Sequence, residues 1–351
     1  METHKITIND SYAVLLKNGI LGDLGDLVSE SLGISRAFII TDADVAPLYL
    51  AKAEAALRGA GYDVKSAVLP AGEACKTAKC YISVLNDLAN AGFSKSDIVI
   101  ALGGGAVSDL AGFAAATYMR GIRYAVVPTT LLSMVDSSIG GKTAIDLAAG
   151  KNLAGAFHDP ALVVMDPLTL KTLHASALQN GYAEIIKYGI LSGDAILDSL
   201  RHALFYDDFE NVIFSSLSLK KHIVEKDAHD SSIRQYLNFG HLIGHAFEAH
   251  EGFGCIHGKA VALGLALETK GCAMAGLTEY KLYEEISDLI SEFGFRTTTK
   301  LSASDLMPFV LRDKRIRNGR IDLVIPEAIG RCRMKNIDLD ELGEFIKLAL
   351  E

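Results

Sequence analysis

The chain has 351 residues, of which 50% are hydrophobic and 22% are charged, and its formal net charge is −9. These proportions exclude a disordered chain, and the length favours two globular domains over one. The acidic balance argues against a nucleic-acid partner, whose binding surfaces are basic, but it leaves room for a basic pocket that takes an anionic small molecule.

The first half of the chain alternates short strands with helices. We predict strands at residues 37–41, 62–69, 97–101, 124–127 and 162–165. We predict helices after Asp42 through Ala56, over 77–91 and over 108–116. This alternation indicates a mostly parallel, Rossmann-like sheet with helices on both faces, and ligands of such sheets bind beyond the carboxyl ends of the strands.

The pattern changes after about Pro167 and becomes mainly helical. Helices are predicted at 177–191, 208–226, 237–251, 260–275 and 279–292, followed by one short strand at 320–325 and a last helix at 339–350. The sequence therefore predicts an α/β domain over residues 1–170 and a mainly α-helical domain over residues 171–351.

The cysteines and the first residues of the chain bear on its compartment. The chain has 5 cysteines, an odd number with no CxxC pair, which predicts reduced thiols rather than a disulfide framework. Met1-Glu-Thr-His-Lys-Ile lacks the pattern of a signal sequence, and no apolar run is long enough to span a bilayer. We expect a cytoplasmic protein without a membrane partner.

Two segments of the first half are suited to holding anions. Ala101-Leu-Gly-Gly-Gly-Ala-Val-Ser-Asp109 follows a predicted strand directly, so its backbone N–H groups and the next helix N-terminus could face a phosphate, although a tight strand–helix turn explains three glycines equally well. The hydroxyl-rich segment Pro128–Thr143 contains Lys142, and Lys151 follows in Gly150–Phe157. Lysines flanked by glycines on loops are typical of anion clamps.

The second half contains an acid and three histidines that could bind a metal. Glu184 lies in an apolar helical stretch one turn before Lys187, which favours a paired or metal-bound carboxylate. His241 and His245 share a helix face, and His257 follows. One carboxylate and two imidazoles are typical ligands of a catalytic zinc. The residues alone leave open whether His245 or His257 joins His241, and a third histidine would serve as a proton shuttle.

A cationic site for phosphate and carboxylate groups is also predicted in the second half. Lys220, Arg234 and Asn238 precede or enter the histidine helix, and Asp313-Lys314-Arg315 follows later in the chain. Charged helix faces are often simply solvated, so this grouping is a hypothesis that depends on the fold.

Together these motifs resemble those of the 3-dehydroquinate synthase family, within the sugar phosphate cyclase superfamily. The resemblance runs from about residue 36 to 330, and it rests on Gly72–Thr77, Gly103–Asp109, Pro128–Thr143, Gly150–Phe157, Gly181–Gly189, Leu237–His245 and His257-Gly258. It implies a dehydroquinate synthase-like fold, NAD bound by the first domain, Zn²⁺ or Co²⁺ at the cleft and a homodimer.

The resemblance also implies a role for individual residues. The metal ligands would be Glu184, His241 and His257, with His245 as a polar or proton-transfer residue beside the substrate. NAD would lie against Asp42, Glu73, Lys76, Gly104, Gly105, Asp109, Thr129, Thr130, Lys142, Lys151 and Thr172. The substrate would meet Asp136, Lys142, Asn152, Lys187, Lys220, Arg234 and Asn238. Arg120 would reach the neighbouring subunit's site, and the Asp313-Lys314 pair would close on the substrate.

The reaction implied is conversion of 3-deoxy-D-arabino-heptulosonate 7-phosphate to 3-dehydroquinate and phosphate, a step of the shikimate pathway towards aromatic amino acids. NAD would oxidise the C5 alcohol, the resulting ketone would acidify C6, and phosphate would be eliminated before the hydride returns and an aldol step closes the ring. Because NAD is regenerated, the enzyme would be a lyase rather than a net dehydrogenase.

Several positions depart from the family's usual residues. Lys259 stands where glutamate is usual, Asp227-Ala-His-Asp230 replaces a segment with two glutamates, and Asp44, Asp146, Asp159 and Arg315 are further changes.

Two other enzymatic functions stay open. The chain could be a sister cyclase with a valiolone-, scyllo-inosose- or amino-dehydroquinate-type product, or a net alcohol dehydrogenase of the glycerol-dehydrogenase type. A degenerate, non-catalytic binding protein is the third alternative.

Overall fold

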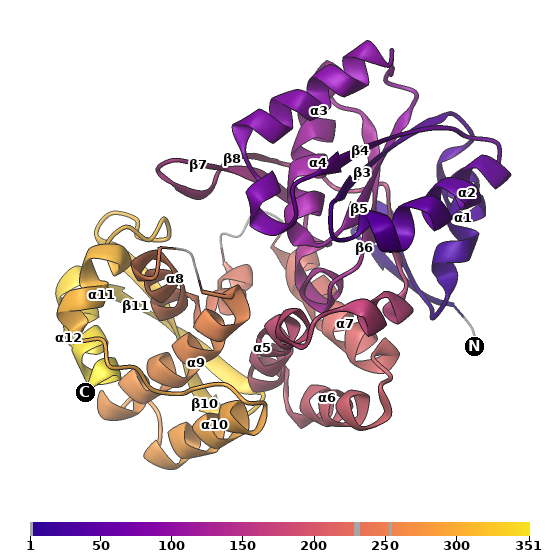
Figure 1. Cartoon of the computed structure of the whole chain (residues 1–351). Helices are drawn as coiled ribbons and strands as arrows, with labels where there is room; N and C mark the ends of the chain where they lie inside the picture. The colour runs from indigo at the N-terminus through magenta and orange to yellow at the C-terminus, as the bar shows by residue number, and fades with distance from the viewer. Residues whose placement is uncertain (1–2, 228–231, 253–254) are drawn as a thin grey trace. The chain divides into compact units, whose positions relative to one another are not determined.

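The structure is a computed structural model that describes residues 3–227, 232–252 and 255–351. The chain forms two compact units, Met1–His174 and Ala175–Glu351, each with its own core (Figure 1). Ala228, His229 and Asp230, three of the residues noted above as departures from the family, lie outside the described residues.

The first unit is built on a seven-stranded sheet with the order β1-β2-β9-β6-β5-β3-β4. The strands are β1 (His4–Ile8), β2 (Tyr12–Leu16), β3 (Arg36–Asp42), β4 (Asp63–Leu69), β5 (Ile98–Gly103), β6 (Arg123–Pro128) and β9 (Leu162–Met165). Only β1 runs antiparallel to its neighbour among these described pairings. Central strands such as β5 are buried along their whole length, as expected where helices cover both faces.

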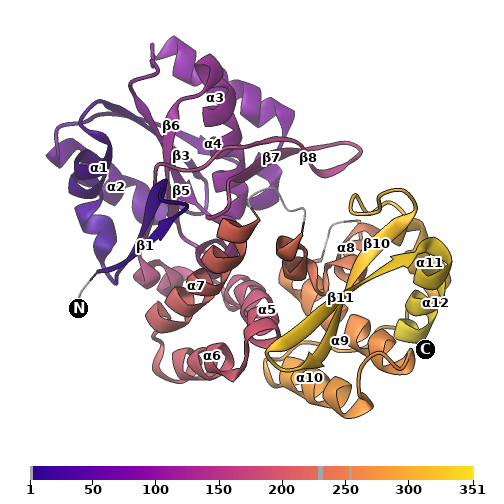
Figure 2. The same ribbon diagram turned by 180° about the vertical axis from the view of Figure 1, so that it is seen from behind.

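Helices cover the two faces of this sheet. The four are α1 (Leu24–Leu32), α2 (Ala51–Gly59), α3 (Ala78–Asn90) and α4 (Gly105–Thr117). Figures 1 and 2 show α1 and α2 on one side of the sheet and α3 and α4 on the other. A hairpin of β7 (Lys142–Leu147) and β8 (Gly150–Phe157) packs on α4. The predicted parallel Rossmann-like sheet is therefore confirmed.

The second unit is mainly helical, as predicted. Its helices are α5 (Ala175–Ser192), α6 (Asp194–Tyr206), α7 (Glu210–Lys226), α8 (His241–His250), α9 (His257–Met274), α10 (Tyr280–Glu292), α11 (Ala303–Val310) and α12 (Leu339–Leu350). The hairpin β10 (Arg320–Ala328) and β11 (Arg331–Asp338) completes it. Helix α9 is buried over most of its length, because α5, α8, α10 and α12 all pack against it.

Two helix boundaries of the second unit differ from the prediction. The helix expected over 237–251 begins only at His241, because Gly240 has a left-handed φ of 78° and the preceding Ile233–Asn238 forms a 3₁₀ helix. Helix α9 begins at His257, earlier than the expected residue 260. Both histidines therefore occupy the first position of a helix.

No helix in the described part of the chain has the length and apolar character needed to cross a membrane.

Candidate functional site

Three of the predicted metal ligands meet within the second unit. Glu184 lies on α5 with its side chain fully buried, and His241 and His257 begin α8 and α9. The Nε2 atoms of His241 and His257 lie 3.5 and 3.7 Å from the same Glu184 oxygen. One possible ligand atom from each of the three residues lies within 4.8 Å of the other two. A carboxylate and two imidazoles at this spacing fit a divalent zinc-type ion with an open position.

His245 lies beside this triad without joining it. Its ring centre is 5.0 Å from that of His241 and 5.9 Å from that of His257. A second possible group of metal ligands combines His245, Glu248 and His257. Of the two pairings that the residues alone left open, the structure places His241 and His257, rather than His241 and His245, around Glu184.

Local geometry explains why His241 and His257 come together. The Glu268 carboxylate, on α9, accepts hydrogen bonds from the backbone N–H groups of Gly240 (2.9 Å) and Ile243 (3.0 Å) at the start of α8. Any side chain at Gly264 would collide with the Gly240 carbonyl oxygen, so α8 and α9 can approach closely only because residue 264 is glycine. Burial, partly offset by these N–H groups and Arg315, raises the pKa of Glu268 to about 7.

The pKa values of the two imidazoles shift in opposite directions. Burial lowers the pKa of His241 well below its usual value, and Lys187 and His257 lower it further. Burial also opposes the charged form of His257, but hydrogen bonds to Glu184 and Glu248 outweigh it and raise its pKa to about 10. A metal ion would replace the proton that His257 directs at Glu184, which is the usual exchange when a histidine binds a metal.

Lys187 is a buried cation next to the triad. Its side chain is 2% exposed, its ammonium pairs with Glu184, and it donates a hydrogen bond to the Leu237 carbonyl oxygen at 2.7 Å. The Glu184–Lys187 pair is therefore not a surface ion pair, as the apolar neighbours of the two residues in the sequence had indicated. A fixed ammonium in a dry site can stabilise developing negative charge.

Other predicted anion-binding residues of this unit are buried or lie near the histidine helix. Lys220 and Arg234 are both buried. Asp227 accepts hydrogen bonds from the backbone of Arg234 and Ser232, which fixes the segment before α8. The guanidinium of Arg315 forms an ion pair with Asp313 and donates to the Asn238 carbonyl oxygen at 3.4 Å, while Lys314 is exposed.

The glycine segment of the first unit forms the turn between β5 and α4. Gly103 ends the strand and Gly105 begins the helix. A Cβ atom at Gly104 would lie 3.0 Å from a Thr130 methyl carbon, and one at Gly105 would lie 2.8 Å from the Ser137 hydroxyl. The turn therefore leaves its backbone N–H groups at a helix N-terminus with no room for side chains, a geometry suited to phosphate.

Lys76 connects two other predicted residues of the first unit. Its buried ammonium lies 2.7 Å from the Asp109 carboxylate and 2.5 Å from the Asn152 side-chain oxygen. Burial raises the pKa of Asp109 to about 6 even though Lys76 opposes the shift. Asn152 itself has a left-handed φ of 56°, and its backbone N–H donates to Asp146. The cluster thus joins the β7–β8 hairpin to α4.

The remaining predicted residues are spread over the loops of the first unit. Asp42 accepts hydrogen bonds from the backbone of Asp44 and Val45, and Thr172 bonds the Tyr49 hydroxyl at 2.6 Å. Arg120 has a left-handed φ of 64° in the turn after α4. The Thr129 backbone donates to the Gly103 carbonyl oxygen at 2.9 Å, and the Thr130 hydroxyl accepts from the Ser133 backbone at 3.2 Å. The remaining four lie in the 3₁₀ helix Gly72–Cys75 (Glu73), in the π-helical turn Ser133–Ser137 (Asp136), at the start of β7 (Lys142) and in β8 (Lys151). The predicted nucleotide residues all belong to Met1–His174, and the three metal residues belong to Ala175–Glu351.

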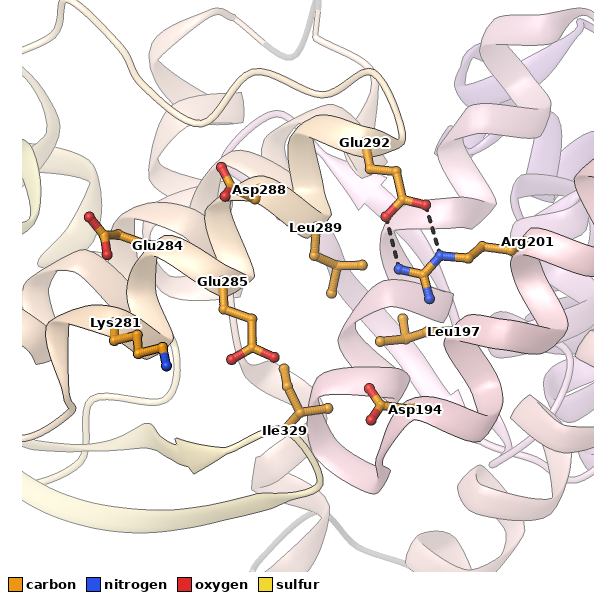
Figure 3. Close-up of a pocket in the computed structure, with 10 residues that line it drawn as sticks. All are labelled: Asp194, Leu197, Arg201, Lys281, Glu284, Glu285, Asp288, Leu289, Glu292 and Ile329. Carbon is orange, nitrogen blue, oxygen red and sulfur yellow. Dashed lines mark hydrogen bonds and ion pairs between the residues drawn. The ribbon is translucent and has the colours of Figure 1, made fainter.

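A hollow between α6 and α10 is a separate feature of the second unit. It has a volume of about 520 Å³ and is lined by Asp194, Leu197, Arg201, Lys281, Glu284, Glu285, Asp288, Leu289, Glu292 and Ile329. Figure 3 shows the Arg201 guanidinium pointing at Glu292, to which it is bonded at 2.8 Å. None of the predicted site residues lines this hollow, and its carboxylates would repel a phosphorylated acid.

Two buried acids of the second unit were not singled out from the sequence. Glu248 lies 3.1 Å from Nδ1 of His257, and Glu268 holds the start of α8. Both follow apolar helical residues, and an acid in such a run must find partners when buried. That signal was available in the sequence, although it does not say which partner each acid meets.

Comparison with known proteins identifies the family of the chain. The 3-dehydroquinate synthase N-terminal family model matches residues 66–180, and the 3-dehydroquinate synthase C-terminal model matches residues 181–316. A 3-dehydroquinate synthase of Thermoanaerobacter sp. (strain X514) is 38% identical over 345 residues, which cover 96% of this chain and 97% of that protein. The chain belongs to the 3-dehydroquinate synthase family.

Solved structures with the same fold include two synthases of other cyclic products. A 2-deoxy-scyllo-inosose synthase, crystallised with carbaglucose-6-phosphate, NAD⁺ and Co²⁺, has a TM-score of 0.88 at 22% identity, over 99% of each chain. A 2-epi-5-epi-valiolone synthase from Streptomyces hygroscopicus subsp. jinggangensis 5008, with NAD⁺ and Zn²⁺ bound, has a TM-score of 0.86 at 24% identity, over 97% of each chain. At these identities the likeness establishes the fold, and the predicted dehydroquinate synthase-like fold class is confirmed.

Proposed function

We propose that this chain converts 3-deoxy-D-arabino-heptulosonate 7-phosphate to 3-dehydroquinate and phosphate, as an NAD- and metal-dependent, cyclising carbon–oxygen lyase. The observation that carries the proposal is the Glu184–His241–His257 triad with the buried ammonium of Lys187 beside it, in a member of the 3-dehydroquinate synthase family. This places the chain in the shikimate pathway, which leads to chorismate and the aromatic amino acids.

The residues of each unit fit the two groups that the reaction needs. Glu184, His241 and His257 would hold Zn²⁺ or Co²⁺, and the Gly103–Gly105 turn with Lys76 and Asp109 would hold NAD. When bound, NAD exchanges a hydride with the C5 carbon of the substrate while the metal ion polarises the C5 oxygen.

The chain's own residues bind the anionic substrate and stabilise developing charge. The buried side chains of Lys220 and Arg234 supply cations for a phosphate or a carboxylate. Lys187, held by Leu237 and Glu184, keeps a positive charge in a fixed position without serving as a ligand. His245, beside the triad, can carry a proton. The leaving phosphate can take the C6 proton itself, so the chain needs no strong dedicated base.

The assembly and location of the enzyme are part of the same proposal. We infer a cytoplasmic homodimer in which Arg120 serves the site of the neighbouring subunit, because the resemblance to the family implies both. Size-exclusion chromatography with light scattering tests the dimer, and activity in mixtures of Arg120→Ala and Lys187→Ala chains tests the shared site. Partial recovery of activity in the mixture is expected if a residue crosses between subunits.

The decisive experiment measures phosphate release from the heptulosonate phosphate with catalytic amounts of NAD, before and after chelation. Chelator-sensitive release without accumulation of NADH is the expected result. Closure of sedoheptulose 7-phosphate with no reaction of the heptulosonate would identify a sister cyclase instead. Accumulation of NADH on polyols without phosphate release would identify a dehydrogenase of the glycerol-dehydrogenase type.

A further inference from the structure

Both imidazoles of the triad are hydrogen-bonded on the side that faces away from Glu184, but to different partners. Nδ1 of His241 lies 3.1 Å from the carbonyl oxygen of Phe239, which is neutral. Nδ1 of His257 lies 3.1 Å from the carboxylate of Glu248, which is anionic when ionised. The Nε2 atoms of both rings are left to face Glu184.

Glu248 is placed so that it can act on His257 from within the protein. It lies on α8, the helix that His241 begins, and its side chain is only 4% exposed, whereas that of His257 is 30% exposed. The less buried ring is thus oriented by the more buried acid. A carboxylate that accepts a proton from one imidazole nitrogen fixes the tautomer and raises the basicity of the other nitrogen.

We propose that Glu248 is a positioning residue that holds the Nδ1–H of His257 and so directs the Nε2 lone pair at the bound divalent cation. The inference rests on the proposed function, because it takes Glu184, His241 and His257 as the ligands. It adds that the two histidines are unequal donors. His257, oriented by a charged acceptor, contributes more to metal affinity through its outer hydrogen bond than His241, which is oriented by a peptide carbonyl.

An alternative role for Glu248 is that of a ligand. His245, Glu248 and His257 also lie close enough to hold an ion. In that arrangement the metal would occupy the Nδ1 side of His257, and the bond between Nδ1 and Glu248 would be lost. The two roles differ in the number of ions bound per chain. A positioning role gives one ion, whereas a second site made by Glu248 gives two.

The test compares metal binding by Glu248→Ala, Glu248→Gln and wild-type full-length chains. Co²⁺ and Zn²⁺ affinities of the metal-free proteins are measured by competition with a chelator, and the visible spectrum of bound Co²⁺ reports the coordination. Removing a hydrogen-bond partner of this kind weakens metal binding by about 10- to 100-fold, which is the loss expected for Glu248→Ala. Glu248→Gln should lose less, because its amide oxygen still accepts the Nδ1 proton.

A matched control separates positioning from loss of a negative charge or of stability. Glu251→Ala removes an acid at the end of the same helix, where the side chain is 48% exposed, and should leave metal affinity unchanged. Thermal unfolding of the metal-free proteins checks that each variant folds. Should Glu248→Ala fail to fold, Glu248→Gln, which preserves the shape of the side chain, decides the result.

Each outcome bears on the proposal. One ion per wild-type chain, with weakened binding in both Glu248 variants and not in Glu251→Ala, supports it. Two ions per wild-type chain, with one lost in Glu248→Ala and the other bound as tightly as before, overturns it in favour of a ligand role. Unchanged affinity in the Glu248 variants overturns it and leaves the proposed function intact. A wild-type chain that binds neither ion overturns the proposed function and this inference together.

Discussion

The glycine turn of the first unit and the triad of the second use different chemical groups of the chain. The turn at Gly103–Gly105 offers backbone N–H groups, and its requirement is that no side chain intrudes. The triad offers charged side chains that are buried, and its requirement is that each charge has a partner. The first kind of site is therefore sensitive to added volume, and the second to the removal of a single charge.

The largest effect is expected where a ligand of the triad is removed. Glu184→Ala or His257→Ala should lose the bound metal and at least about 1,000-fold of activity together, because a bound cation contributes several kcal/mol to the reaction. Metal content and phosphate release check this on the same samples. His250→Ala, at the far end of α8, is the control that should keep both. An active variant without metal would show that the ligand assignment is wrong.

A smaller loss is expected when the charge beside the triad is removed and the ligands are kept. Lys187→Ala should retain the metal but lose about 100- to 1,000-fold in turnover, the usual cost of losing one positioned electrostatic group. The metal-free variant should also be less stable, because Glu184 would be left as a buried acid without its lysine. Metal content, turnover and urea unfolding with and without Zn²⁺ distinguish these effects. Full activity of the variant would show that Lys187 serves only as the ion-pair partner of Glu184.

Added volume in the glycine turn should affect the nucleotide and not the metal. Gly105→Ala places a methyl group 2.8 Å from the Ser137 hydroxyl, so either the Ser137 side chain or the turn must shift. We expect NAD affinity to fall about tenfold, or 1.4 kcal/mol, at unchanged Co²⁺ affinity. Calorimetric titration with each ligand provides the measurement. Gly59→Ala, where nothing lies within 4 Å of the new Cβ, is the matched control. Equal losses of NAD and metal binding would contradict the separation of the two sites.

The smallest effect on activity is expected at Glu268, where the readout is stability against pH. Burial raises its pKa from 4.5 to about 7, with Arg315 and backbone N–H groups opposing the shift and Cys272 as a neighbouring thiol. The folded chain therefore binds the Glu268 proton more tightly than the unfolded chain does. The resulting contribution to the free energy of unfolding is complete below about pH 4.5 and is lost as pH rises through 7. Denaturant unfolding of wild type and Glu268→Gln from pH 4 to 8 should show a steeper decline with rising pH in the wild type, because the contribution of Asp109, whose pKa is also raised, declines in both.

Much of the fold could be predicted because its strands and helices carry strong periodic patterns. The predicted strands at 37–41 and 97–101 contain the uninterrupted apolar runs 37–40 and 98–101, and they form β3 and β5 in the centre of the sheet. The hairpins β1–β2 and β7–β8 were missed. Strands β1 and β8 are only partly buried and mix polar with apolar residues, so they have no such signal. Strand β11, rich in charged residues, was missed for the same reason. Strand β2 is an apolar run of five residues, and its signal was available in the sequence.

The site could be predicted only in part from the residues. Spacing places His241 and His245 on one face of a helix, yet the structure gathers His241 and His257 around Glu184, because both begin helices that cross closely at Gly264. Helix periodicity says nothing about such a crossing. The partners of Glu248 and Glu268 depend on the same crossing, and they too could not be read from the sequence.

The position of β2 in the sheet has a consequence for folding during synthesis. Residues Ala13–Leu16 pair with Leu162–Met165, and no other described strand connects the β1–β2 hairpin to the sheet. A ribosome must release nearly the whole first unit before this pairing can form, and contacts of such long sequence separation make folding slow. Until then the β1–β2 hairpin is not paired with the rest of the sheet, and one of its strand edges is exposed. Because exposed strand edges promote aggregation, we expect a chaperone to bind the partly synthesised chain.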